Sequence, residues 1–279
     1  MEQLKQLLTA AGIAYKENEP LAAHCTFKIG GPARLLVQPT DRAQLCRAVA
    51  LCKAQGVRYY LLGNGSNILF ADEGYNGAVL DVSSMQDAVE VHGTQLTAGA
   101  GVRLSALCKT ALEHGLTGLE FAYGIPGTVG GAVYMNAGAY GGEMKDVLTT
   151  VQYLTAEGEV KEAAAAELDL RYRHSIFEEN GGCILSAQFA LTPGEPEAIR
   201  AKMDELMAKR LDKPSAGSTF KRPVGAFAAA LIDQCGLRGY RHGGAAVSEK
   251  HCGFVVNLGG ASCADVLALC EEVRTIVKE

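Results

Sequence analysis

The chain has 279 residues, of which 48% are hydrophobic and 20% are charged, and its formal net charge is −5. This length provides one large domain or two modest ones with a substantial core, and the acidic balance argues against a general nucleic-acid-binding protein. The charge is uneven, because positions 207–250 hold eight Lys or Arg and three Asp or Glu, a local balance of +5. A solvated basic face is the default explanation, and an anionic small-molecule ligand is the alternative.

Nine cysteines are spread along the chain, and no C-x-x-C pair occurs among them. Their odd number and scattered spacing predict buried free thiols in a reducing compartment, with no disulfide framework and no metal site. The first residues, MEQLKQLLTAAG, contain no long apolar core. We therefore expect no signal peptide, no membrane segment and a cytoplasmic location.

The first elements expected along the chain are two short strands with a helix between them. The strands lie at 35–38 and 59–62. Thr40 is the expected N-cap of the helix, Asp41 lies in its first turn, and Gly56 closes it. Apolar residues at helical spacing between these ends support the assignment.

Further strands and helices follow from apolar runs and periodicity. Strands are expected at 78–82, 95–100, 151–154 and 183–191, and helices at 104–115, 197–210 and 263–278. The charge balance changes sign near the helix at 197–210. We therefore place a domain boundary at 195, which divides the chain into a region 1–194 and a second domain 195–279.

The segment 121–142, FAYGIPGTVGGAVYMNAGAYGG, contains seven glycines and no charged residue. So many glycines, with Pro126 and Asn136, make a poor membrane-spanning helix. Glycine lets the backbone adopt positive φ and lets a ligand approach main-chain N–H groups. The run therefore favours backbone that lines a large flat ligand. The alternative is a buried glycine-rich turn that packs only against itself.

A second glycine cluster, LLGNGSNILF at 61–70, follows the strand expected at 59–62. Its main-chain N–H groups can turn toward one point, which suits phosphate oxygens. It matches neither G-x-G-x-x-G nor the lysine-containing phosphate loop, and a simple strand-to-loop turn is its local alternative. Two such clusters suit a dinucleotide with a pyrophosphate better than a mononucleotide.

Two polar positions are candidates for chemistry. Arg173, in YRHSIF at 172–177, keeps its proton, so it can hold an anion or polarise a carbonyl. His174 beside it suggests a general base, although a lone histidine there is more often incidental. Ser218 follows a glycine and precedes two cations, but G-x-S-x-G is absent, and local chemistry alone favours an ordinary turn serine.

These segments together resemble one protein family, the UDP-N-acetylenolpyruvoylglucosamine reductases, in the shorter type without an inserted tyrosine-bearing loop. The matching segments, in chain order, are TFKIGGPARLLV at 26–37, LGNGSNILF at 62–70, GIPGTVGGAVYMNAGAYGGE at 124–143, YRHSIF at 172–177, AGSTFKRP at 216–223 and GYRHGGAAVSEKHCGFVVN at 239–257. They cover nearly the whole chain.

The resemblance implies an α+β fold, with a vanillyl-alcohol-oxidase-like (PCMH-type) FAD-binding domain of two α/β subdomains and a smaller α+β substrate-binding domain. It implies FAD as cofactor, bound by two groups of residues. These are Gly63, Asn64, Gly65, Ser66 and Asn67 for the pyrophosphate, and Gly124, Ile125, Pro126, Gly127, Gly130, Gly131, Asn136, Ala137 and Gly138 for the flavin and its tail.

The reaction that the resemblance implies is the reduction of UDP-N-acetylglucosamine enolpyruvate to UDP-N-acetylmuramate for peptidoglycan synthesis, which supports cell-wall biogenesis, cell shape and cell division. NADPH delivers hydride to FAD and leaves, and the enolpyruvyl group then receives it. Arg173 stabilises the negative charge that develops. Ser218 donates a proton as general acid, a contribution of roughly 10²–10⁴ in rate. Tyr172, Lys213, Lys221 and Arg222 are the implied substrate-binding residues.

Two departures from the family pattern concern the second domain. The segment before Pro214 is several residues shorter than usual, so Lys213 is only a candidate for the family's substrate-binding lysine. The family also places a catalytic glutamate on a strand beyond position 279, and no residue here matches it. A C-terminal strand is therefore expected to be missing, and the alternative function is a flavin- and nucleotide-sugar-binding protein with little turnover. A different oxidase on the same flavin fold is a third hypothesis.

Overall fold

A computed structural model gives the fold of the chain and describes residues 1–85, 88–211 and 213–278. Helices and strands are mixed throughout. The α-helices are α1 (Glu2–Ala10), α2 (Arg42–Ala54), α3 (Leu104–Glu113), α4 (Val129–Tyr134), α5 (Phe177–Asn180), α6 (Pro196–Ala208), α7 (Ala228–Gln234) and α8 (Cys263–Lys278). In the described part of the chain, none of the helices combines the length and apolar character needed to cross a membrane.

The described strands form two four-stranded sheets, one of them near the C-terminus, one five-stranded sheet and two short pairs. The first four-stranded sheet has the order β1 (Ala14–Pro20), β2 (Pro32–Gln38), β4 (Tyr75–Asp81), β3 (Tyr59–Leu62). The five-stranded sheet has the order β11 (Val160–Ala164), β10 (Leu148–Leu154), β12 (Cys183–Ala190), β6 (Gln95–Gly99), β5 (Val89–His92). The third has the order β14 (Ser215–Ser218), β17 (Phe254–Asn257), β16 (Ala245–Val247), β15 (Arg241–His242). The pairs are β7 (Leu116–Thr117) with β13 (Thr192–Pro193), and β8 (Gly138–Ala139) with β9 (Gly142–Glu143).

Local sequence patterns predicted most of these elements, and the start of α2 differs from the prediction by one residue. The N-cap of α2 is Asp41, whose side chain accepts a hydrogen bond of 2.8 Å from the N–H of Gln44. The Gln44 side chain in turn accepts from the N–H of Thr40 at 3.0 Å. The expectation that Thr40 is the cap is therefore wrong by one residue, because the carboxylate of Asp41 is the group that reaches the free N–H. Gly56 follows the helix with φ of +60°, as expected.

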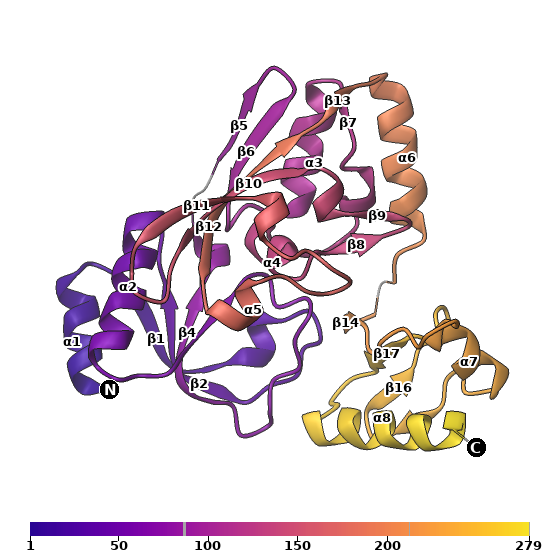
Figure 1. Cartoon of the computed structure of the whole chain (residues 1–279). Coiled ribbons are helices and arrows are strands. Elements are labelled where there is room, and N and C mark those ends of the chain that lie inside the picture. The colour runs from indigo at the N-terminus through magenta and orange to yellow at the C-terminus, as the bar shows by residue number, and fades with distance from the viewer. Residues whose placement is uncertain (86–87, 212, 279) are drawn as a thin grey trace. The chain divides into compact units, whose positions relative to one another are not determined.

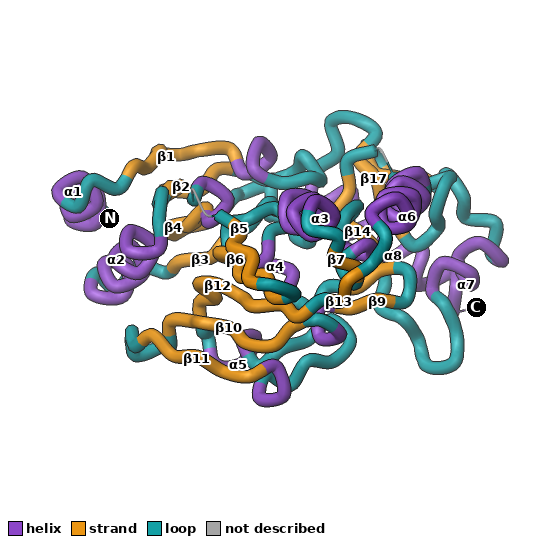
Figure 2. The backbone as a smooth tube through the Cα atoms, turned by 90° about the horizontal axis from the view of Figure 1, so that it is seen from above, coloured by secondary structure: helices purple, strands orange, loops and turns teal. Residues whose placement is uncertain are grey.

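The chain divides into two compact units, which differ from the expected division at 195. The first unit comprises 1–16, 36–64 and 78–210, and the second comprises 17–35, 65–77 and 211–279. Helix α6 belongs to the first unit, since it packs against α3 and against the short 3-10 helix η3 (Glu120–Ala122). Both views show α6 beside α3 (Figure 1; Figure 2).

The core of the first unit lies on its five-stranded sheet, in which the neighbouring strands pair antiparallel. Inward residues such as Val151 and Ala187 are no more than 1% exposed. Helix α4, formed inside the glycine-rich run, packs against β12. This packing buries Val129 and Val133 and anchors the run to the sheet.

The second unit is held together by long-range polar contacts as well as by its sheet, and α8 lies against β15 and β16 (Figure 1). Asp72 accepts hydrogen bonds from the N–H groups of Cys263 (2.7 Å) and Ala264 (3.1 Å) at the start of α8. The buried side chain of Asn257 donates to the carbonyl of Phe27 at 3.1 Å. These contacts explain why 17–35 and 65–77 group with the C-terminal residues.

Candidate functional site

Asn64 and Pro126, one from each glycine cluster, are in contact within the first unit. The side-chain amide of Asn64 donates a hydrogen bond of 2.7 Å to the carbonyl of Pro126. A Cβ atom at Gly63 would collide with the hydroxyl oxygen of Thr128. Only glycine therefore permits this approach at position 63, and the loop after β3 is fixed against the start of α4.

Residues 65–67, which belong to the second unit, have the properties of a phosphate-binding nest. Gly65 has φ of +59°, and a Cβ there would lie 2.6 Å from the Cα of Cys25. Within the described residues, the main-chain N–H groups of Gly65, Ser66 and Asn67 donate no hydrogen bond. Consecutive free N–H groups suit phosphate oxygens. The loop therefore fits the pyrophosphate of a dinucleotide such as FAD.

Several glycines of the 121–142 run are needed for packing rather than for an open surface. A Cβ at Gly130 would lie 2.9 Å from the Cβ of Ala100, and one at Gly142 would lie 2.6 Å from the ring of Phe121. Gly131 is exposed, and its added Cβ would meet only the Thr128 hydroxyl, at 3.5 Å. The self-packing alternative thus explains part of the run, while Gly131 leaves open space for a ligand.

The other residues expected to line the flavin lie on the turn before α4, on the segment between α4 and β8, and on β8 itself. Ile125 donates to the carbonyl of Ala122 (2.9 Å), and Gly127 donates to that of Ile125 (2.8 Å), which gives a tight turn around the exposed Pro126. Ala137 is 7% exposed and Asn136 is 2% exposed. Gly138 is partly exposed in β8. The assignment of these residues to the flavin remains a prediction.

Arg173 lies on a surface turn of the first unit, beside the glycine-rich run. Its backbone has φ of +55°, a left-handed conformation that is uncommon for a residue with a Cβ atom. Its Nη2 lies 3.5 Å from the carbonyl oxygen of Gly138, and its guanidinium is 6.0 Å from the centre of the Tyr172 ring. Tyr172 is 54% exposed. Arg173 and Tyr172, both predicted site residues, therefore lie at the surface next to the segment that is predicted to line the flavin.

His174, considered as a general base, is held by carboxylates instead. Its ring nitrogens lie 3.2 Å from Asp169 and 3.3 Å from Glu178. These contacts explain its orientation without a catalytic role, which agrees with the incidental interpretation.

Arg210 belongs to the same region, although sequence reasoning did not single it out. Its guanidinium lies 5.5 Å from the centre of the Tyr140 ring, and the ammonium of Lys209 lies 5.8 Å from the same ring. Burial lowers the pKa of Arg210; Tyr140 opposes this effect, and the positive charge of Arg173 lowers the pKa further. Arg173 and Arg210 therefore create a shared positive potential near Tyr140. The basic stretch at 207–250 was the available signal in the sequence.

Ser218 ends β14 in the second unit, where it pairs with Phe254 across to β17. It is exposed, and the preceding Gly217 has φ of +81°. Lys221 and Arg222 follow it on the exposed surface, and the guanidinium of Arg222 lies 4.6 Å from the centre of the Phe227 ring. The Ser218 hydroxyl is thus presented to solvent from a strand end.

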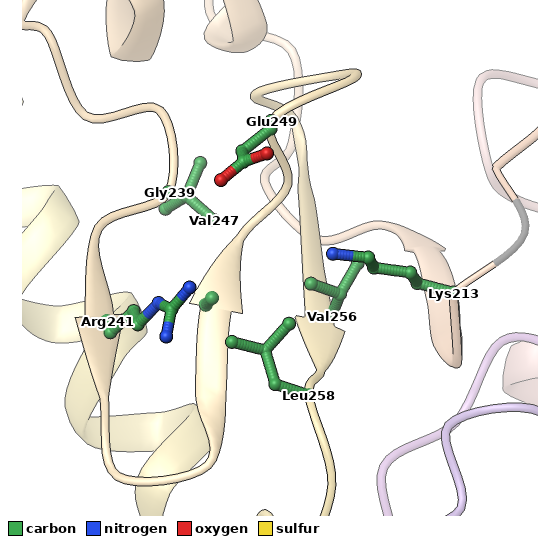
Figure 3. A pocket seen from close by; sticks show the side chains of 8 residues that line it. Lys213, Gly239, Arg241, Val247, Glu249, Val256 and Leu258 are labelled. Atoms are coloured by element: carbon green, nitrogen blue, oxygen red, sulfur yellow. The ribbon is translucent and has the colours of Figure 1, made fainter.

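Lys213 lines a pocket on the sheet of the second unit. Figure 3 shows Lys213 and Arg241 reaching toward it from opposite sides, with Glu249 at its rim. Val247, Val256 and Leu258 supply apolar lining. The pocket thus combines two cations, one carboxylate and an apolar floor. Arg241, on β15, was not singled out from the sequence, although it lies in the matching segment at 239–257.

The cysteines are free thiols. Six are buried, and Cys235 is exposed. Burial raises the pKa of Cys183 to about 12, which makes this thiol a poor nucleophile and metal ligand at neutral pH. Among the described residues no cluster of three His, Cys, Asp or Glu side chains is suited to a metal ion.

Two family models match the chain. Residues 33–164 match an FAD binding domain. Residues 209–279 match the C-terminal domain of UDP-N-acetylenolpyruvoylglucosamine reductase. The first match contains both glycine clusters, and the second contains Ser218 and the Lys213–Arg241 pocket.

Relatives extend over the whole chain. UDP-N-acetylenolpyruvoylglucosamine reductase from Agathobacter rectalis is 48% identical and covers 100% of this chain and 92% of its own length. The enzyme of that name from Clostridioides difficile is 45% identical over 94% of this chain and 88% of its own length.

Solved structures extend the comparison to the fold. The crystal structure of UDP-N-acetylenolpyruvylglucosamine reductase from Thermus caldophilus is 35% identical, with a TM-score of 0.80 and coverage of 94% of both chains. The BBE-like 1 protein of Physcomitrella patens is 22% identical, with a TM-score of 0.51 over 68% of this chain and 44% of its own, a likeness of fold alone. The expected α+β fold with a PCMH-type FAD-binding domain is confirmed. This chain belongs to the UDP-N-acetylenolpyruvoylglucosamine reductase family.

Proposed function

We propose that the chain catalyses the NADPH-dependent, FAD-mediated reduction of UDP-N-acetylglucosamine enolpyruvate to UDP-N-acetylmuramate, a step of peptidoglycan synthesis. The observation that carries the proposal is the position of Arg173, whose guanidinium lies 3.5 Å from Gly138 within the run expected to line the flavin. A fixed cation at that place suits a reaction that develops negative charge on the substrate.

The backbone of the two glycine clusters would hold FAD. Gly65, Ser66 and Asn67 offer N–H groups to the pyrophosphate. The hydrogen bond from Asn64 to Pro126 joins the residues just after β3 to the run. When bound, FAD supplies the chemistry of accepting hydride from NADPH and of passing hydride to the enolpyruvyl double bond.

Arg173 acts on the charge that the transfer creates. When hydride forms a C–H bond at the vinyl methylene carbon, the π electron pair moves toward the adjacent carbon and its carboxylate. The guanidinium of Arg173 binds this carboxylate and stabilises the enolate. Arg210, which lies near Arg173 and Tyr140, adds positive potential in the same region.

Ser218 completes the reduction by donating a proton. Its O–H bond breaks as a C–H bond forms at the carbon next to the carboxylate, and the alkoxide then recovers a proton from solvent. Serine is a weak acid, so nearby positive charge from Lys221 and Arg222 favours its conjugate base. The exposed place of Ser218 at the end of β14 leaves it open to a substrate.

The nucleotide part of the substrate carries a diphosphate, and the second unit provides cations for it. Lys213 and Arg241 reach into one pocket from opposite sides (Figure 3). We assign them to the diphosphate, and Tyr172 to the surface of the substrate near Arg173. Free thiols such as the buried Cys108 and Cys183 are typical of a reducing compartment, so we place the reaction in the cytoplasm.

A binding protein with little turnover, the alternative considered from the sequence, is not favoured. Curated relatives that are 43–48% identical over at least 94% of this chain carry the reductase name. The experiment that tests the proposal combines flavin content with turnover. The purified protein is expected to be yellow, and to oxidise NADPH rapidly when the enolpyruvyl nucleotide is added. A preparation that cannot bind FAD, or that binds it and leaves NADPH unoxidised with this substrate, would contradict the proposal.

A further inference from the structure

The turn that carries Arg173 is closed by two backbone hydrogen bonds between Arg171 and His174. The N–H of Arg171 donates to the carbonyl of His174 at 3.2 Å, and the N–H of His174 donates to the carbonyl of Arg171 at 3.1 Å. Tyr172 and Arg173 are thus the two central residues of a tight turn, and φ of Arg173 is +55°. Since such a backbone is unfavourable for arginine, contacts outside the turn must hold it in place.

Asn136 makes the contact that reaches this turn from the glycine-rich run. Its Nδ2 donates to the carbonyl of Arg171 (3.1 Å) and to the carboxylate of Glu143 (2.7 Å), while its Oδ1 accepts from the N–H of Lys145 (3.0 Å). These partners fix the orientation of the amide, because two oxygens face Nδ2 and an N–H faces Oδ1. Both amide hydrogens of this buried side chain are therefore engaged within the protein.

The same amide also fixes the surface against which the Arg173 guanidinium lies. Gly138, whose carbonyl is 3.5 Å from Nη2 of Arg173, pairs with Glu143 in the β8–β9 hairpin. Asn136 thus connects the backbone of the Arg173 turn with the hairpin that borders its side chain. Its φ of +38° suits asparagine, which tolerates left-handed backbone better than most residues.

A second attachment holds the other end of the turn. The buried hydroxyl of Ser175 donates a hydrogen bond of 2.6 Å to the carbonyl of Tyr134 at the end of α4. With Asn136 on one side and Ser175 on the other, the turn is anchored to the segment between α4 and β9.

We propose that Asn136 is a positioning residue for Arg173, which it places for binding the carboxylate of the substrate as negative charge develops there. This inference rests on the role of Arg173 in the proposed function. It assigns to the Asn136 side chain a task distinct from cofactor binding, since its amide donors are directed to Arg171 and Glu143.

The discriminating variant is Asn136→Asp. Aspartate has nearly the same shape, tolerates the same backbone and keeps an oxygen for the N–H of Lys145, but when ionised it donates to neither Arg171 nor Glu143. Asn136→Gly removes the whole amide at a φ that glycine adopts freely, and serves if the aspartate variant does not fold. Asn76→Asp, at an exposed asparagine, introduces the same charge elsewhere and is the matched control.

The measurement is the rate of each half-reaction by stopped-flow absorbance of the flavin. Asn136→Asp is expected to leave FAD content and flavin reduction by NADPH unchanged. It is expected to slow reoxidation of the reduced flavin by the enolpyruvyl nucleotide by about 10- to 100-fold, as small misplacements of a catalytic group do. In an Arg173→Ala background it should cause no further loss, because its effect passes through Arg173. The Asn76→Asp control should behave as the wild type.

Other outcomes distinguish failure of the role inferred for Asn136 from failure of the role proposed for Arg173. If Asn136→Asp slows both half-reactions alike, or slows reoxidation by the same factor with and without Arg173, the positioning role is wrong and the residue acts on cofactor or fold. If Asn136→Asp and Asn136→Gly both keep wild-type reoxidation while Arg173→Ala loses it, the inference fails and the proposed function stands. If Arg173→Ala itself keeps wild-type reoxidation, the role proposed for Arg173 fails, and the inference fails with it.

Discussion

Asn64 and Pro126 lie 62 positions apart in the chain and are joined by a hydrogen bond of 2.7 Å from the Asn64 side chain to the Pro126 carbonyl. The contact connects the loop after β3 with the turn that precedes α4. Both segments are rich in glycine and lack regular structure over most of their length, so each depends on such contacts for a defined shape. The hydrogen bond therefore holds the residues around Asn64 and Pro126 in a defined arrangement before a cofactor binds.

Asn64→Ala is therefore expected to weaken FAD binding. Loss of one hydrogen bond costs about 1 kcal/mol, which corresponds to about a fivefold rise in the dissociation constant for FAD. Titration of the apoprotein with FAD measures this constant by fluorescence quenching. Asn76→Ala, at an exposed asparagine, is the control. Equal affinities for Asn64→Ala and the wild type would show that the contact does not shape the site.

Lys213→Ala and Arg241→Ala are each expected to raise KM for the enolpyruvyl nucleotide by about tenfold or more, because a hydrogen bond to a charged group contributes about 1.5–3 kcal/mol. Flavin reduction by NADPH should stay unchanged. Steady-state and single-turnover kinetics test both statements. Lys161→Ala removes an exposed lysine on β11 and should alter neither. A change in kcat at constant KM would place these residues outside substrate binding.

Asp72 caps α8 from a distant part of the chain, with hydrogen bonds of 2.7 and 3.1 Å to the N–H groups of Cys263 and Ala264. Asp72→Ala should lower the free energy of unfolding by about 1 kcal/mol, as loss of an N-terminal cap does. Urea denaturation followed by circular dichroism gives the value. The neighbouring Glu73→Ala is the control, and an equal loss in both variants would argue for a general charge effect instead.

Protonation of Asp265, in the first turn of α8, is coupled to the stability of the protein. Its carboxylate accepts from the N–H of Ser262 (3.1 Å) and of Gly244 (3.2 Å), and these bonds lower its pKa below the ordinary 3.8. A lowered folded-state pKa stabilises the protein above the unfolded pKa, and this stabilisation disappears as the pH falls through the folded-state pKa.

The variant Asp265→Asn tests this relation. The wild type should exceed it in unfolding free energy at about pH 6, and the difference should shrink progressively below about pH 4. Denaturant titrations at several pH values measure the difference. A difference that stays constant down to about pH 3 would show that the ionised carboxylate is not its source.

The parts of the fold that local chemistry specifies were predictable. The strand at Tyr59–Leu62 and the helix at Cys263–Lys278 agree with their apolar patterns. Helix α4 was not foreseen, since glycines lower helix propensity; its position follows from packing on β12. The division into units also escaped prediction, because contacts such as Asp72–Cys263 join residues that no local pattern relates.

The candidate site was likewise predictable only where a local motif or the composition pointed to a residue. Arg173 and Ser218 were identified through motifs, and the glycine clusters through composition. Arg210 was missed because an arginine in a basic stretch gives no sign of the surface it faces, and Arg241 was not singled out although it lies in a matching segment. The role of Asn136 depends on its contact with Arg171, 35 positions away, which only the tertiary structure reveals.

The most direct test of the proposed reaction separates its two halves in the variant Ser218→Ala. With this substitution, NADPH should reduce the bound flavin at the wild-type rate, because no proton from Ser218 is needed. Reoxidation of the reduced flavin by the enolpyruvyl nucleotide should slow by roughly 10²–10⁴, the usual contribution of a general acid. Stopped-flow absorbance of the flavin measures both rates, with Ser215→Ala on the same strand as control. Reoxidation by Ser218→Ala at the wild-type rate, or an equal loss in both halves, would contradict the account.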